Sequence, residues 1–167
     1  PVTAARKVRI EKLACEGGTP FRYDFGKLDI IAVRATDASG ATVDLYGKLS
    51  PSGELVWSAP NGNWTVYALV GEGTGQKVKR AAPGGEGLVM DYFSRNALAQ
   101  YLSRFDCAFD AAPVARVRAF YNDSYEVYGA DWTVNLPREF KARRGYDLLA
   151  HLGEFAGDGP EDMVSRV

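Results

Sequence analysis

The sequence has 167 residues, of which 46% are hydrophobic and 25% charged, a composition typical of a folded globular protein and not of a disordered chain. Its formal net charge of −1 gives no electrostatic signature of binding to nucleic acid or to an anionic membrane surface. No apolar stretch approaches the roughly 20 residues of a membrane-spanning helix, so we expect neither nucleic acid nor a membrane as a partner.

The first part of the chain, residues 1–75, contains short β-rich runs separated by turn signals. The predicted strands cover 7–13, 28–36, 41–45, 54–58 and 63–71. Between the last two strands stands Asn61-Gly62, a dipeptide typical of a tight β-hairpin. Trp57 and Trp64 bracket this turn, and we expect both in the core. Residues 1–75 are therefore predicted to form a small antiparallel β unit.

The second part, residues 76–167, alternates predicted strands and helices. A short strand over 88–90 ends at Asp91, and Ser94 caps a helix. One face of that helix is apolar and carries Ala97, Leu98, Tyr101, Leu102 and Phe105. A β-rich strand over 114–121 then completes a strand–helix–strand repeat, which is typical of a parallel α/β sheet. Helices are predicted over 137–144 and 146–152, and a further one from Pro160.

Few residues suit nucleophilic or metal chemistry. Cys15 and Cys107 lie far apart without metal-ligand spacing, so we expect buried free thiols, with a disulfide as the alternative. His151 is the single histidine; it follows an apolar helical stretch and is interpreted as structural. The glycine-rich stretches within 72–87 match neither phosphate-binding pattern and are interpreted as open loops.

The run Asp123-Ser124-Tyr125-Glu126 follows the predicted strand over 114–121 directly. Carboxylates just past the C-terminal end of a strand occupy the place where α/β proteins carry out chemistry. An aromatic residue between two acids can also remove water from one of them and raise its pKa, as a general acid requires. The alternative is that Asp123 and Ser124 only cap a turn.

Five blocks of the sequence together resemble glycoside hydrolase family 106, the α-L-rhamnosidases. They follow one another in the family's order over about residues 28–155. The blocks are Trp57 to Tyr67, Gly87 to Ser94, Asp123 to Glu126, Trp132-Thr133, and Glu139 to Leu149. The resemblance implies a catalytic (β/α)8 barrel interrupted by a β insertion. A barrel of this kind typically needs about 250 residues, so the fold expected here is α/β, with a β insertion over 1–75 followed by a partial (β/α) barrel segment over 76–167.

The resemblance also implies the hydrolysis of terminal α-L-rhamnosides with inversion, and dependence on calcium. Such a reaction needs one carboxyl group that protonates the leaving oxygen and another that activates water. We choose Glu126 as one of this pair. Asp123 is expected to orient the loop or bind a sugar hydroxyl. Asp91 is expected to contact a hydroxyl or calcium, with a strand-end cap as an equal alternative.

Two aromatic residues complete the predicted site. Tyr125 or Trp132 can shield Glu126 from water, and Trp132 can stack on a sugar face, although aromatic residues after a strand more often lie in the core. The expected partner is a rhamnose-containing oligosaccharide or glycoside. By resemblance, a periplasmic or extracellular bacterial location is favoured.

Two alternatives remain from the sequence. The β half and its tryptophans could form a carbohydrate-binding module without catalysis, or the chain could be truncated and without a function of its own. The sequence starts at Pro1 and ends at Val167, inside a predicted helix. We therefore expect a piece of a longer protein that is inactive in isolation.

Overall fold

The structure is a computed structural model that describes residues 3–112, 118–119, 121 and 126–167. It forms two compact units, one from Pro1–Lys7 and Gly73–Asn135 and the other from Val8–Glu72 and Leu136–Val167. The first elements along the chain are β1 (Arg6–Glu16), β2 (Pro20–Asp24), β3 (Asp29–Asp37), β4 (Thr42–Asp44), η1 (Tyr46–Lys48), β5 (Glu54–Ser58) and β6 (Asn63–Gly73). They are followed by α1 (Arg95–Ala111), α2 (Leu136–Arg144), η2 (Leu148–Ala150), α3 (Leu152–Phe155) and α4 (Glu161–Val164). The division into 1–75 and 76–167 stays a prediction.

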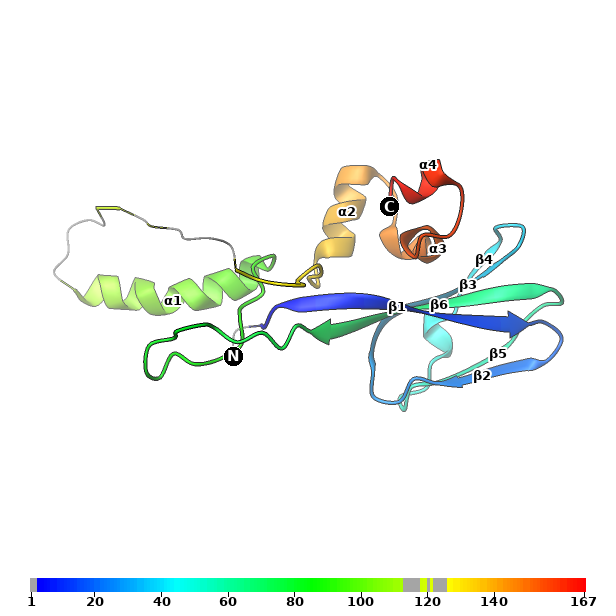
Figure 1. Cartoon of the computed structure of the whole chain (residues 1–167), viewed down its shortest axis with the longest axis horizontal. Coiled ribbons are helices and arrows are strands. Elements are labelled where there is room, and N and C mark those ends of the chain that lie inside the picture. Colours follow the sequence, from blue (N-terminus) through cyan, green and yellow to red (C-terminus); the bar gives the residue numbers. More distant parts are fainter. Residues whose placement is uncertain (1–2, 113–117, 120, 122–125) are drawn as a thin grey trace. The chain divides into compact units, whose positions relative to one another are not determined.

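The strands form a four-stranded sheet in the order β1-β6-β3-β4 and a two-stranded sheet of β2 and β5 (Figure 1). The pairs β2–β5, β3–β4 and β3–β6 are antiparallel; in the last of them Ala35 lies opposite Val66. The register of β3 against β6 is interrupted by an irregularity between Ile30 and Ala32. The predicted antiparallel β unit is confirmed.

The core of this unit lies between the two sheets. Alternate residues of β3 and β6, among them Val33, Val66 and Ala68, point to one face and are fully buried there, because successive side chains of a strand face opposite sides. Trp57 and Trp64 are buried in the same cluster, with ring centroids 5.3 Å apart in an edge-to-face arrangement. Each fully buried Val or Leu contributes about 1.5–3 kcal/mol, so this cluster is the main source of stability in the unit.

The hairpin predicted at Asn61-Gly62 is wrong. β5 pairs with β2, whereas β6 pairs with β3 and lies next to β1, so the turn connects two different sheets. The chain does bend at Asn61-Gly62, with a φ of 120° at Gly62. Gly17, in the connection from β1 to β2, fits against it and donates its N–H to the Gly62 carbonyl at 2.7 Å. The two connections between the sheets, from β1 to β2 and from β5 to β6, therefore pack on one another.

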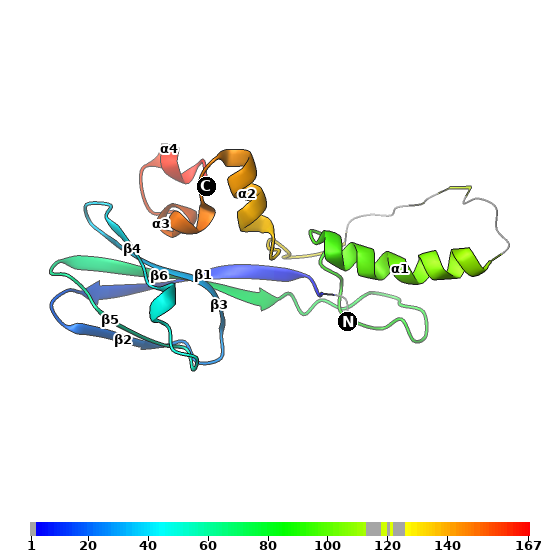
Figure 2. The ribbon, with the colours of Figure 1, turned by 180° about the vertical axis from the view of Figure 1, so that it is seen from behind.

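Helices α2, α3 and α4 cover the face of the four-stranded sheet opposite the β2–β5 pair, as the view from behind also shows (Figure 2). α2 ends as predicted, with Gly145 at a φ of 82° and its N–H donating to the Lys141 carbonyl at 2.9 Å. The predicted helix over 146–152 is instead the short η2 followed by α3, and the helix from Pro160 is α4.

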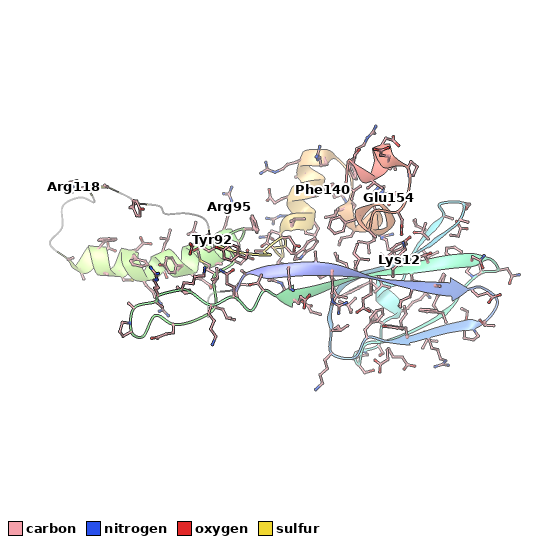
Figure 3. All side chains as sticks on the ribbon, in the orientation of Figure 1. Lys12, Tyr92, Arg95, Arg118, Phe140 and Glu154 are labelled. Carbon is pink, nitrogen blue, oxygen red and sulfur yellow. The ribbon has the colours of Figure 1, made fainter. Side chains whose placement is uncertain are left out.

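Polar contacts hold these helices to the sheet. The hydroxyl of Tyr67 on β6 donates to Asp158 at 2.8 Å, and Lys12 on β1 forms an ion pair with the same carboxylate. Figure 3 shows Lys12 next to the helical segment that includes Glu154. Burial, together with the hydrogen bond to Asp158, raises the pKa of Tyr67 to about 12. The hydrogen bond from Lys12, followed by that from Tyr67, lowers the pKa of Asp158.

The other unit contains α1 and extended segments joined by single β-bridges. The predicted cap at Ser94 is confirmed, because its hydroxyl oxygen accepts the Ala97 N–H at 3.2 Å. The predicted strand over 88–90 forms only isolated bridges at Leu88 and Met90. The strand predicted over 114–121 lies largely outside the described residues, and a partial barrel stays a prediction. Among the described residues, no helix is both long and apolar enough to cross a bilayer.

The cysteines and the histidine are also placed by the structure. Both cysteines are free, as expected, but only Cys15 is buried; Cys107 is exposed on α1, so the burial predicted for it is wrong. Burial raises the pKa of the Cys15 thiol. The His151 ring lies 3.3 Å from a Glu154 oxygen and packs edge-to-face on Tyr146, contacts that suit a structural residue.

Candidate functional site

The predicted catalytic residue, Glu126, lies in a loop whose backbone is fixed by one side chain. The Glu126 carbonyl accepts a hydrogen bond from Gln76 Nε2 at 2.5 Å. The Tyr128 N–H donates to Gln76 Oε1 at 2.7 Å. Glu126 itself is exposed, and its carboxylate has no hydrogen-bond or ion-pair partner within the described part of the chain. The Glu126 side chain is thus open to solvent, while the Gln76 amide fixes the backbone through hydrogen bonds at Glu126 and Tyr128.

Gln76 is in turn positioned by its own backbone. Its carbonyl accepts the Val89 N–H at 2.8 Å, and its N–H donates to Thr74 Oγ1 at 3.3 Å. The next residue, Lys77, forms a β-bridge with Leu88. The side-chain amide therefore starts from a paired, extended segment and reaches a loop 50 residues further along the sequence.

Asp91 is buried, with 1% of its surface exposed, and both of its carboxylate oxygens have partners. One accepts from the hydroxyl of Thr133 at 2.8 Å, and the other from the N–H of Phe93 at 3.0 Å. These bonds offset the cost of removing the carboxylate from water. Because the Asp91 carbonyl also accepts the Ser94 N–H at 3.1 Å, the residue organises the turn into α1. These contacts give Asp91 the role of a strand-end cap. Its contact with a sugar hydroxyl or calcium stays a prediction.

The aromatic and acidic neighbours predicted for the site are only partly described. Trp132 is buried, with 2% of its surface exposed, and its backbone N–H donates to the Arg6 carbonyl at 3.3 Å. Stacking of its ring on a sugar stays a prediction that requires the ring to become uncovered. Asp123 and Tyr125 lie outside the described residues. The structure thus brings Asp91 into contact with the Trp132-Thr133 segment. Glu126 lies earlier in the segment that leads to Trp132, where the backbone is bonded to Gln76 instead.

The described residues do not fit a metal site. Among them, no group of three or more His, Cys, Asp or Glu side chains is placed to hold a metal ion. Calcium takes six to eight oxygen ligands, and both oxygens of Asp91 already accept protein hydrogen bonds. Calcium dependence therefore stays a prediction from the resemblance.

Two residues of this site, Gln76 and Thr133, were not predicted from the sequence. Gln76 stands in a glycine-rich stretch interpreted as an open loop, and no local pattern indicates a partner 50 residues away. Thr133 belongs to the Trp132-Thr133 block of the resemblance, which is the signal that could have drawn attention to it. A further loop contact is that of Lys79 Nζ, 5.2 Å from the centroid of the Tyr128 ring.

Comparison with known proteins assigns the chain to a family. The family model of the α-L-rhamnosidases, glycoside hydrolase family 106, matches residues 9–161. The chain belongs to this family. The match includes Gln76, Asp91, Glu126 and Thr133.

Two similar proteins are much longer than this family 106 chain. A protein of Formosa agariphila named "Putative beta-glucuronidase" is 32% identical over 132 residues, which cover 77% of this chain and 11% of that protein. The solved structure of a rhamnosidase from Novosphingobium sp. PP1Y is 33% identical, with a TM-score of 0.58, and the match covers 71% of this chain and 12% of that one. The chain thus spans about an eighth or less of the length of these relatives.

Proposed function

We propose that this chain contributes to the hydrolysis of terminal α-L-rhamnosides as part of the catalytic region of a larger enzyme. The observation that carries the proposal is the family match over residues 9–161, which contains the loop of Glu126. The 33% identity to a solved rhamnosidase supports the same sugar. The substrate would be a rhamnose-containing oligosaccharide or glycoside.

In this proposal Glu126 is one of two catalytic carboxyl groups. Inverting enzymes hold these groups roughly 6.5–9.5 Å apart, so that a water molecule fits between one of them and the sugar. Glu126 suits this role because its carboxylate is exposed while the backbone that carries it is fixed by Gln76. Such fixing matters, since a displacement of about 1 Å of a catalytic group can cost about 100-fold in rate.

The test of the proposal compares two substrates, because the names of the two relatives point to different sugars. The longer protein that contains this sequence is incubated with an aryl α-L-rhamnoside and with an aryl β-D-glucuronide. We expect cleavage of the rhamnoside, with β-L-rhamnose as the first anomer in the NMR spectrum. Cleavage of the glucuronide alone would refute the sugar assignment, and α-L-rhamnose as the first product would refute inversion.

A further inference from the structure

A small cavity of about 220 Å³ lies in the sheet-containing unit, between β3, the start of η1 and η2. Polar and aromatic side chains line it, namely Arg34, Asp44, Tyr46 and Asp147, together with Leu149. Residues 31–34 of β3 also line it, and the irregularity of this strand lies between Ile30 and Ala32. All of these residues belong to one compact unit, and none of them belongs to the site around Glu126.

Arg34 is held in a defined orientation at this cavity. Its Nε donates to the Leu149 carbonyl at 2.5 Å, and its Nη2 donates to Asp44 at 3.3 Å. The other oxygen of Asp44 accepts the Tyr46 N–H at 2.9 Å, which fixes the start of η1. The guanidinium has five N–H donors in a rigid plane, and these two bonds leave donors over for a ligand. A fixed planar donor next to a fixed carboxylate suits a pair of hydroxyl groups on a ligand.

The charges that surround the cavity balance one another. Arg34 pairs with Asp44, and Lys141 Nζ lies 3.4 Å from Asp147. Asp147 also accepts the Leu149 N–H at 3.0 Å. Because each carboxylate already has a cationic partner, a charged ligand gains little attraction here, whereas a neutral ligand with hydroxyl groups meets both donors and acceptors.

Tyr46 supplies an aromatic surface at the edge of the cavity. It is 51% exposed, whereas Trp57 and Trp64, the tryptophans of the β half, are both buried in the core. An exposed aromatic ring next to directional polar groups offers an apolar platform and oriented hydrogen bonds together. The volume lies below the roughly 300–1,000 Å³ of pockets for drug-sized molecules, which restricts the ligand to about one ring.

We propose that this cavity binds one neutral pyranose unit of a glycan without cleaving it. The sugar ring stacks on Tyr46, and its hydroxyl groups bond to Arg34 and the carboxylates of Asp44 and Asp147. The proposal goes beyond the hydrolysis proposed above: it gives the β unit a substrate-docking role of its own, carried by Tyr46 instead of by the tryptophans.

The experiment is an NMR titration of the full 167-residue chain, with ¹⁵N-labelled amides observed and methyl α-L-rhamnoside, methyl α-D-mannoside and methyl β-D-galactoside added in turn. We expect at least one sugar to give saturable shifts that centre on the amides of Tyr46 and Leu149. Tyr46→Ala should weaken that binding about tenfold or more, which corresponds to about 1.4 kcal/mol, while Tyr46→Phe keeps the ring and the binding.

Matched controls test whether the effect is local. Asp44→Asn should weaken binding, whereas Glu54→Gln, in the exposed Arg22–Glu54 pair on the other sheet, should not. Thermal unfolding of each variant shows that it is folded. No saturable shift with any of the three sugars, shifts centred elsewhere, or unchanged binding by a folded Tyr46→Ala variant would overturn the proposal. Glu86→Gln, at an exposed residue of the other unit, should bind as the unmodified chain does, and because the readout is binding, this result is independent of the proposed catalysis.

Discussion

Replacing Gln76 with alanine removes both hydrogen bonds that hold the backbone around Glu126. A hydrogen bond in a protein contributes about 0.5–1.5 kcal/mol net, and because this loop is largely exposed we take the lower half of that range for each bond. The free energy needed to open the loop should therefore be about 1–2 kcal/mol lower in Gln76→Ala than in the unmodified chain. The open state is then about 5–30 times more populated.

The assay is native-state hydrogen exchange of the Tyr128 amide, whose N–H bonds directly to Gln76 Oε1. Exchange should accelerate by about 5–30-fold in Gln76→Ala and remain unchanged in Gln100→Ala, which alters an exposed glutamine on α1. Gln76→Glu keeps an acceptor for the Tyr128 amide but loses the donor to the Glu126 carbonyl, so exchange of the Tyr128 amide should accelerate by only about 2–5-fold. Equal exchange in Gln76→Ala and the unmodified chain would refute the assigned role of Gln76.

Three further predictions concern stability. Thr133→Val leaves the buried Asp91 carboxylate without one donor and should lower the free energy of unfolding by about 1–3 kcal/mol in urea titrations; an unchanged midpoint would contradict the contact. Gly17→Ala places a Cβ 1.8 Å from the Pro60 carbonyl oxygen, so it should lower stability by about 1–3 kcal/mol or more, measured as a lower melting temperature. Because its neighbours lower the pKa of Asp158 in the folded chain, its carboxylate stabilises the fold above the unfolded pKa of about 3.9, and this stabilisation is lost as the pH falls through the folded value. The melting temperature of Asp158→Asn should therefore lie below that of the unmodified chain at pH 7 and approach it below about pH 4, and a difference that is constant with pH would contradict this.

Strand positions could be predicted because they depend on local patterns. The strand predicted over 54–58 is β5 with the same bounds, since its alternating residues Leu55 and Trp57 face the core. β2 was missed, although Phe21 and Tyr23 alternate with exposed residues in the same way, because the segment is short and begins at a proline. The partners of the strands could not be predicted. A turn sequence sets a local reversal of the chain, whereas the core between two sheets decides which strands pair.

The site shows the same division between local and long-range information. Ser94 as a helix cap follows from residues three positions apart, and the structure confirms it. The contacts of Gln76 with the Glu126 loop and of Asp91 with Thr133 join residues 50 and 42 positions apart, and nothing in the local sequence indicates them. The resemblance marked the segments that contain Glu126 and Asp91, but it did not reveal which neighbours hold these residues in place.

The assignment of Glu126 as a catalytic carboxyl group is tested most directly by Glu126→Gln in the proposed larger enzyme, with Glu86→Gln, an exposed glutamate of the same unit, as the matched control. Hydrolysis of an aryl α-L-rhamnoside is measured for both variants, and equal melting temperatures show that both are folded. We predict that kcat falls by at least about 100-fold in Glu126→Gln and is unchanged in Glu86→Gln. A Glu126→Gln enzyme that turns over its substrate at nearly the normal rate would contradict the assignment.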